Sequence, residues 1–100
     1  MLNTLSVDKE ILLITQEECA EVSQAISKIF RFGLEERYEN QTNREHLEEE
    51  IGDLLCMIEL LASHGIISET ACELAKKQKR NKLAKWSNIF QKSEAVLNER

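Results

Sequence analysis

The sequence contains no proline and only three glycines among its 100 residues. Proline and glycine supply many of the turns in β-sandwiches and barrels, and an all-β chain of this length would need a good number of them. Their scarcity favours long helices joined by few turns, so we predict an all-α fold. One domain, spanning residues 1–100, is the most that this length allows, and its hydrophobic core is modest in size.

The hydrophobic pattern predicts two long helices in the first two thirds of the chain. Apolar residues recur at steps of three and four, the period of a helix with one buried face, over residues 7–31 and again over residues 43–63. Thr42 stands three residues before Glu45, which is the spacing of a capping box and predicts the start of the second helix. The polar residues 34–43 have no period and predict a loop.

A third helix is predicted from Glu69 onward, with Ser68 as its N-cap. The pattern leaves open whether this helix continues to about Leu97 or bends near Ser87 into a fourth helix. We predict an antiparallel bundle of three to four helices. Because one chain gives such a bundle little apolar coverage, we expect a homodimer or homotetramer to complete it.

Charge is distributed unevenly along the chain. Residues 1–65 carry 5 basic and 14 acidic side chains, a balance of −9, whereas residues 66–100 carry 8 basic and 4 acidic ones, a balance of +4. This division suggests two complementary surfaces, although a solvated basic helix face would give the same count. No apolar run is long enough to span a bilayer and no signal pattern precedes the first helix, so we predict a cytoplasmic protein with no membrane partner.

Two pairs of acidic residues interrupt the apolar stripes of the first two helices. Glu18 takes a position that the helical period assigns to the core, and Glu21 flanks it three residues later. Glu50 lies within the stripe of the second helix, with Asp53 three residues beyond it. Carboxylates that face a core are costly unless a cation meets them, and four of them on neighbouring helices repel one another. Oxygen ligands at this density suit Mg²⁺ or Mn²⁺, which predicts a metal site.

Solvated or salt-bridged carboxylates are the alternative to a metal site, because 18 of the 100 residues are acidic. Glu17 and Glu49 lie about 100° round the helix from their neighbours and could serve a second ion or face solvent. A ferritin-like di-iron site would need Glu-x-x-His motifs, and neither His46 nor His64 stands three residues after a glutamate. We therefore interpret both histidines as surface or helix-end residues.

The basic segment at residues 76–86 adds candidates for phosphate binding. On the third helix the stripe that includes Cys72 and Leu83 also includes Lys79, and Lys82 follows three residues later. A lysine pair facing a metal-carboxylate cluster predicts a ligand with phosphate groups. We do not expect nucleic acid as a partner, because the basic patch is short, lacks interleaved aromatic residues and belongs to an acidic chain.

These motifs resemble those of the MazG-like nucleoside triphosphate pyrophosphohydrolases, an all-α family. Residues 17–21 have that family's EExxE form, and residues 50–53 have its ExxD form. The surrounding segments, EECAEVSQAISK and LEEEIGDLLCMIELL, are similar to the family's first two helices. The resemblance covers about residues 7–86, so the single domain is expected to be MazG-like.

The resemblance implies Mg²⁺-dependent hydrolysis of a nucleoside triphosphate, ribose or deoxyribose, to the monophosphate and pyrophosphate. The metal-binding roles of the family carry over to Glu18, Glu21, Glu50 and Asp53. By the same resemblance Glu17 would be a further metal contact or the base that activates water.

Phosphate contacts made by the third helix in relatives carry over to Asn81, beside Lys79 and Lys82. The same metal site would also suit another diphosphate-containing nucleotide, such as phosphoribosyl-ATP or an alarmone. Outside enzymes, the alternative is a non-catalytic helical interaction module, which predicts no affinity for Mg²⁺.

Overall fold

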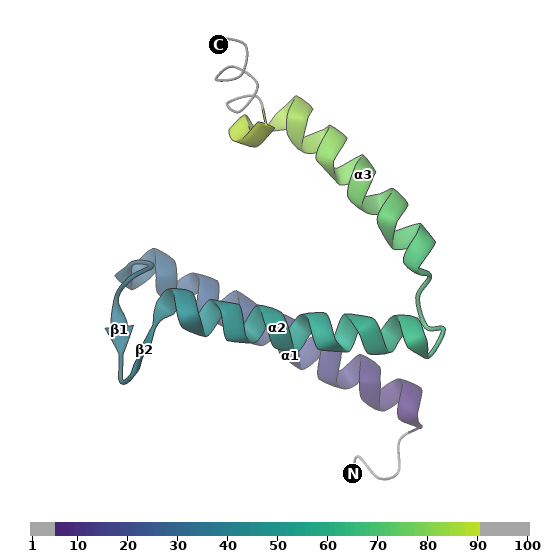
Figure 1. Ribbon diagram of the computed structural model, residues 1–100, viewed down its shortest axis with the longest axis horizontal. Helices are drawn as coiled ribbons and strands as arrows, with labels where there is room; N and C mark the ends of the chain where they lie inside the picture. Colours follow the sequence, from purple (N-terminus) through teal and green to yellow (C-terminus); the bar gives the residue numbers. More distant parts are fainter. Residues whose placement is uncertain (1–5, 91–100) are drawn as a thin grey trace. The chain divides into compact units, whose positions relative to one another are not determined.

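The computed structural model describes residues 6–90 of the chain, and these residues are almost entirely helical (Figure 1). Helix α1 spans Val7–Phe32, and it is followed by the two short strands β1 (Arg37–Tyr38) and β2 (Gln41–Thr42). Helix α2 then covers Asn43–Ser63, and helix α3 covers Glu69–Trp86. The fold is all-α apart from this small hairpin, which confirms the predicted fold class.

Helix α1 begins and ends where local hydrogen bonds satisfy its terminal groups. The Ser6 side chain accepts a hydrogen bond from the Lys9 amide at 3.2 Å, as an N-cap does. At the other end the Gly33 amide donates to the Ile29 carbonyl at 2.8 Å. Gly33 has φ of 101°, a conformation that a side chain would strain, so glycine stops the helix here. The predicted end, residue 31, is one residue short.

Helices α1 and α2 run antiparallel and pack side by side (Figure 1). Their buried apolar residues, Ile11 and Ala25 from α1 with Met57 and Leu61 from α2, form the core between them. These four positions agree with the helical periods of the sequence, but Ile51 and Ile58, which the pattern also assigned to the buried stripe of α2, are exposed. The core is narrow, because two helices alone leave much of each surface exposed.

The link between α1 and α2 is a β-hairpin, so the predicted loop over residues 34–43 is wrong in this part. Strands β1 and β2 pair antiparallel, with Tyr38 opposite Gln41. The turn between them places Glu39 at φ 59°, in the left-handed region. Strands of two residues are too short to show an alternating pattern, which is why periodicity did not reveal them.

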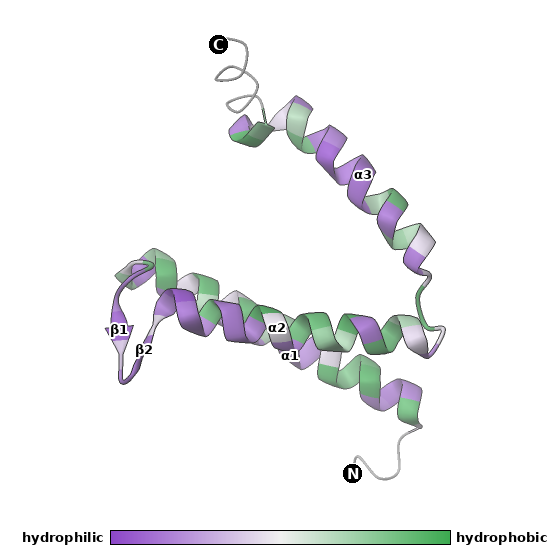
Figure 2. Cartoon of the chain, in the orientation of Figure 1, coloured by the Kyte–Doolittle hydropathy of each residue, from purple (hydrophilic) through white to green (hydrophobic). Residues whose placement is uncertain are grey.

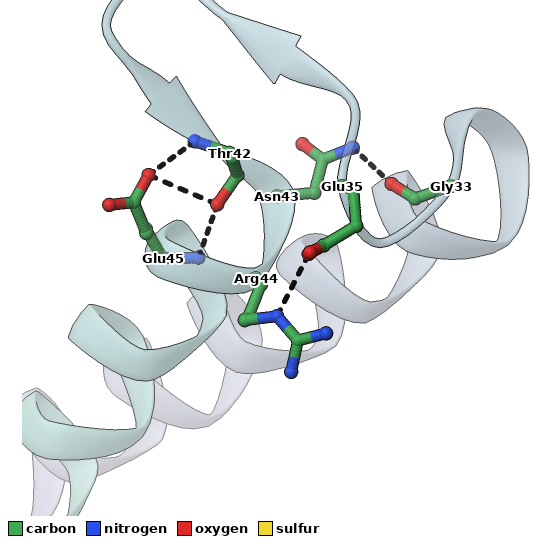
Figure 3. Close-up of polar contacts among 6 residues, drawn as sticks. All are labelled: Gly33, Glu35, Thr42, Asn43, Arg44 and Glu45. Carbon is green, nitrogen blue, oxygen red and sulfur yellow. Dashed lines mark hydrogen bonds and ion pairs between the residues drawn. The ribbon is translucent and has the colours of Figure 1, made fainter.

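The start of α2 is fixed by the predicted capping box (Figure 3). The Glu45 amide donates to the Thr42 hydroxyl oxygen at 3.1 Å, and the Thr42 amide donates to the Glu45 carboxylate at 2.8 Å. Both helix-end amides are thereby satisfied. This capping-box prediction is confirmed.

Two further contacts tie the hairpin and the beginning of α2 to the end of α1 (Figure 3). The buried Asn43 donates from Nδ2 to the Gly33 carbonyl at 2.9 Å, and the Arg44 Nε donates to the Glu35 carboxylate at 2.8 Å. At the opposite end of the helix pair, His64 Nδ1 lies 3.6 Å from Asp8 Oδ1. The hairpin contacts fix the position of α2 against α1, and with it the register of their acidic residues, whereas the exposed contact between Asp8 and His64 adds little.

The chain divides into two compact units with the boundary between Ile66 and Ile67, and α3 lies in the second unit. Ser68 caps α3 by accepting a hydrogen bond from the Ala71 amide at 3.1 Å, as predicted. No residue of α3 is buried. Its middle turns are hydrophilic, whereas α1 and α2 carry hydrophobic residues along much of their length (Figure 2).

Helix α3 ends at Trp86, and Ser87 is extended with φ −132° and ψ 170°. Residues 88–90 are helical again. Of the two alternatives left open by the sequence, the break near Ser87 is therefore correct and the uninterrupted helix is wrong. The predicted extent to Leu97 lies outside the described residues. Within residues 6–90, no helix combines the length and the apolar character that a membrane crossing requires.

Candidate metal centre

Three carboxylates converge where the middle of α1 meets α2. Glu18 comes from α1, and Glu50 and Asp53 come from α2; one oxygen of each lies within 4.8 Å of one oxygen of each of the others. Glu50 is 7% exposed, Glu18 is half-buried and Asp53 is exposed. We refer to these three residues as the acid cluster. It runs from the packed interior of the helix pair to the surface.

The helical period explains why these side chains meet. Glu18 occupies the same stripe as Ile11 and Ala25, and Glu50 occupies the same stripe as Met57. Each of the two glutamates therefore points at the opposite helix, where a packed apolar residue would otherwise stand. Asp53 follows Glu50 by three residues and shares its side of α2. The sequence predicted this placement of Glu18 and Glu50.

Burial and the charge of neighbouring carboxylates raise the pKa of two members of the acid cluster, Glu50 and Glu18. Burial raises the pKa of Glu50 to about 7, and the neighbouring carboxylates of Glu21 and Asp53 contribute to this shift. The pKa of Glu18 is also raised, first by desolvation and then by the charges of Asp53, Glu21 and Glu17. Negative charge at this point of the fold is thus destabilising until a cation compensates it.

Glu21 and Glu17 stand at the margin of the acid cluster. Both are exposed on α1, and Glu21 is close enough to Glu50 to raise its pKa. Glu17 is near enough to raise the pKa of Glu18. The structure thus brings the predicted metal-binding residues of α1 and α2 into one neighbourhood, with Glu18, Glu50 and Asp53 at its centre.

His46 is a neighbour of the acid cluster that the sequence analysis missed. Its Nε2 lies 3.7 Å from a Glu50 carboxylate oxygen, and its side chain is half-buried. The signal was available, because residues four apart lie on the same side of a helix and His46 stands four residues before Glu50. His46 lies in the first turn of α2 and His64 caps the other end, so both are helix-end residues as expected, although His46 is half-buried beside Glu50.

The residues of the acid cluster fit a divalent cation. Mg²⁺ and Mn²⁺ prefer hard oxygen ligands, and Mg²⁺ is usually held by one or two carboxylates together with water and phosphate oxygens. Among residues 6–90, no lysine or arginine forms an ion pair with a member of the acid cluster. A bound cation would supply the positive charge that the raised pKa values of Glu50 and Glu18 indicate is missing.

A cavity of about 570 Å³ lies between the hairpin, the end of α1 and the first turn of α2. It adjoins the acid cluster, since His46 lines the cavity and also contacts Glu50. Lys28 lies 5.8 Å above the ring of Tyr38 at its edge. Most of its lining is polar: Lys28, Tyr38, Glu39, Asn40, Gln41, Thr42, Asn43, Glu45 and His46.

The three residues predicted to contact phosphates lie on α3, in the second unit. Lys79, Asn81 and Lys82 are all exposed. Their approach to the acid cluster stays a prediction. Within α3 they lie in the run from residue 76 to residue 82, which contains no apolar side chain.

The sequence model of the MazG nucleotide pyrophosphohydrolase domain matches residues 7–84 of the chain. The matched range contains the acid cluster, the cavity and the three candidate residues of α3. Neither a curated protein nor a solved structure shows significant similarity to the chain.

Proposed function

The chain belongs to the MazG nucleotide pyrophosphohydrolase family, and on that premise we propose that it hydrolyses nucleoside triphosphates, with ribose or deoxyribose, to the monophosphate and pyrophosphate. Mg²⁺ is the proposed cofactor, with Mn²⁺ as a substitute. The observation that supports this most directly is the meeting of Glu18, Glu50 and Asp53 from two helices within 4.8 Å. The proposed location is the cytoplasm, where nucleoside triphosphates and Mg²⁺ are abundant.

Glu18, Glu50 and Asp53 would hold the cation, with Glu21 beside them. A divalent cation held by carboxylates neutralises phosphate oxygens and lowers the pKa of a bound water. Glu50 must lose its proton to become a ligand, because its raised pKa of about 7 leaves it partly protonated at neutral pH. Binding of the cation therefore releases the Glu50 proton, and the pKa of Glu50 determines the pH above which the cation binds.

Glu17 is the proposed base for the attacking water. It is exposed on α1 directly before Glu18, so it can accept a proton at the rim of the acid cluster without being a ligand. Lys79 and Lys82 of α3 are proposed to bind the phosphates that leave as pyrophosphate, and the Asn81 amide to donate a hydrogen bond to them. The positive charge of this segment matches a product that carries several negative charges.

The nucleoside is proposed to occupy the cavity next to the acid cluster. The cavity is large enough for a base and its sugar, and the side-chain amides of Asn40 and Gln41 at its wall can hydrogen-bond a base edge. Tyr38 offers a ring on which a base can stack. His46 stands between the cavity and Glu50, so a nucleotide that lies in the cavity points its phosphates towards the carboxylates.

The test is to incubate the protein with each of the eight common ribo- and deoxyribonucleoside triphosphates and Mg²⁺, and to measure pyrophosphate separately from orthophosphate. We expect pyrophosphate from the wild type and from Asp8→Asn, whose aspartate lies at the far end of α1, and none from Asp53→Asn.

Release of orthophosphate alone would contradict the proposed reaction. If no triphosphate is hydrolysed but Mg²⁺ raises the melting temperature, the proposed metal site is supported and these eight nucleotides are excluded as substrates. No turnover and no effect of Mg²⁺ would reject the enzyme altogether.

A further inference from the structure

The structure contains a second cavity, of about 420 Å³, at the end of α1 and the beginning of the hairpin. Three of its lining residues, Lys28, Tyr38 and Asn43, also line the cavity that the nucleoside is proposed to occupy. The two cavities are therefore neighbours. A volume of this size is typical of small-molecule sites, and a ligand that fills the first cavity can extend into the second. The proposed function gives the second cavity no role.

Two aromatic rings from different elements line the second cavity. Phe32 is the last residue of α1 and is 56% exposed, and Tyr38 lies in β1 and is 70% exposed. Flat heterocyclic rings stack on exposed aromatic side chains of this kind. Because Tyr38 borders both cavities, a base that stacks on it from the first cavity brings its outer edge to the second. The residues that line the second cavity can then contact that edge.

A carboxylate and a guanidinium lie next to each other in this lining. Glu36 and Arg37 are consecutive and exposed, and neither forms an ion pair with any of residues 6–90. The hairpin holds their backbone in place, because the Asn43 amide donates to the Glu36 carbonyl at 3.0 Å and Arg37 pairs with Thr42 across the strands. Both charged groups are thus available to a ligand.

Guanine is the common base that matches this pair of groups. Its N1–H and its 2-amino group are adjacent donors that one carboxylate can accept together, and its O6 and N7 are adjacent acceptors for a guanidinium. In adenine and cytosine the amino group stands beside a ring acceptor, so a carboxylate gains one hydrogen bond and meets one lone pair. In uracil the single N–H stands between two carbonyl groups. None of these three bases has two adjacent donors.

We propose that the second cavity receives the outer edge of the base, and that Glu36 and Arg37 make the site selective for guanine nucleotides. Glu36 accepts hydrogen bonds from N1 and the 2-amino group, and Arg37 donates to O6 and N7. This inference rests on the proposed function for the position of the nucleoside, and it adds the base that the site selects. Another base leaves a charged group without its hydrogen bonds, which is the loss that makes such sites selective.

The experiment measures binding and not turnover. Isothermal titration calorimetry of the full-length protein with Mg²⁺ compares the α,β-methylene analogues of GTP, ATP, CTP and UTP, in which a P–C bond replaces the bond that the proposed reaction breaks. We expect the GTP analogue to bind at least about tenfold more tightly than the other three. The corresponding inosine analogue, which lacks only the 2-amino group, should bind several-fold more weakly than the guanosine analogue.

Glu36→Gln should weaken binding of the GTP analogue at least about tenfold and leave binding of the ATP analogue within about twofold. It should also abolish the difference between the guanosine and inosine analogues. The matched control is Glu35→Gln, which removes the same charge one residue earlier. The Arg44 guanidinium occupies the Glu35 carboxylate at 2.8 Å, and Glu35 lines neither cavity (Figure 3). This control should keep the preference for guanine.

Several results would overturn the proposal. Equal binding of the four analogues, binding of none, or preference for another base would exclude guanine selection, and hydrolysis of the triphosphates would then leave the proposed function intact. A preference for guanine that Glu36→Gln retains would also contradict the proposal.

Selective binding of guanine that depends on Glu36, without hydrolysis of any triphosphate, would support the base site and reject the proposed reaction. If Glu36→Gln does not fold, as circular dichroism would show, the comparison of the guanosine and inosine analogues on the wild type decides alone.

Discussion

Glu50 is the single acidic residue that is buried within residues 6–90, and its surroundings contain carboxylates and no strong cation. A carboxyl group in this position prefers to be neutral. Glu50 nevertheless stands among the inward-facing residues of α2, where leucine or isoleucine could be buried without a desolvation penalty. This placement costs stability, and a buried carboxyl group with a strongly raised pKa is typical of a functional residue.

The stability of the metal-free protein should fall as pH rises, because of Glu50. Its pKa is about 7 in the folded chain and near 4.5 in the unfolded one, so the folded state holds the proton more tightly between these values. The contribution is fully present below about pH 4.5 and is lost as pH rises through about 7. Thermal melts in chelator should show the wild type losing melting temperature relative to Glu50→Gln between pH 5 and pH 8. A difference that does not change with pH would contradict the raised pKa.

Glu50→Gln should also remove activity by at least about 100-fold, because a neutral amide replaces a charged ligand. Glu48→Gln is the matched control, since Glu48 is an exposed glutamate two residues earlier on α2 and points away from the acid cluster. It should keep activity within about twofold. The measurement is pyrophosphate release at saturating Mg²⁺. Equal losses in both variants would mean that the effect comes from the charge of α2 as a whole.

For single residues, the sequence predicted the acidic residues that interrupt an apolar helical stripe, and it missed His46, which interrupts no stripe. Glu18 and Glu50 were visible because carboxylates stand where the helical period requires apolar side chains. His46 was not, because its proximity to Glu50 depends on how two side chains orient within 3.7 Å of each other, and many helical pairs four residues apart do not touch.

Among the secondary-structure elements, the beginning of α2 has the largest effect on the acid cluster. The residue at which the helix begins determines which side chains of all later turns face α1. Thr42→Ala removes the hydroxyl that caps the Glu45 amide and should lower the free energy of unfolding by about 1 kcal/mol. Urea denaturation followed by circular dichroism measures this. Thr70→Ala is a control on α3, since Thr70 is exposed, and its effect should be much smaller.

Gly52 is the one glycine inside a described helix. A Cβ atom built at this position meets nothing within 4 Å, and the backbone needs no positive φ here. Gly52→Ala should therefore raise the free energy of unfolding by about 0.5–1 kcal/mol, because alanine loses less backbone entropy in a helix. Chemical denaturation of the two proteins checks this. A loss of stability instead would reveal a surface that approaches this point in the assembled protein.

The helices themselves were predictable to within about a residue, because their stripes are long and their caps obey simple rules. The hairpin was not. Its stability comes from backbone pairing across β1 and β2 and from the Asn43 contact to the Gly33 carbonyl, which joins residues ten positions apart. Neither interaction leaves a periodic trace in the side chains of residues 34–43.

For the whole molecule, the division of charge is the feature with a direct consequence for binding. The acidic first unit and the basic α3 carry opposite charge, and a metal-bound triphosphate presents both positive and negative groups. Lys79→Gln should raise the KM for a nucleoside triphosphate about tenfold with little change in kcat, if the lysine binds phosphate. Steady-state kinetics measures both constants.

Lys77→Gln provides the control for this test. Lys77 is exposed two residues before Lys79 and so projects from nearly the opposite side of α3. Both substitutions remove one positive charge. Equal increases in KM would show that only the total charge of α3 matters, whereas a larger effect at Lys79 would locate the phosphates on its side of the helix.

The contact between Asp8 and His64 places the beginning of α1 beside the end of α2. The hairpin joins α1 and α2 at one end of the pair, and this contact brings the other two helix ends together. In a chain limited to α1, the hairpin and α2, a short peptide linker could join the two adjacent ends, and the chain could be reopened at Glu39 and Asn40, the exposed tip of the hairpin. In such a circular permutant α2 would precede α1, and every contact of the acid cluster would be kept. The acid cluster depends on which surfaces of α1 and α2 meet, and not on the order of the two helices in the sequence.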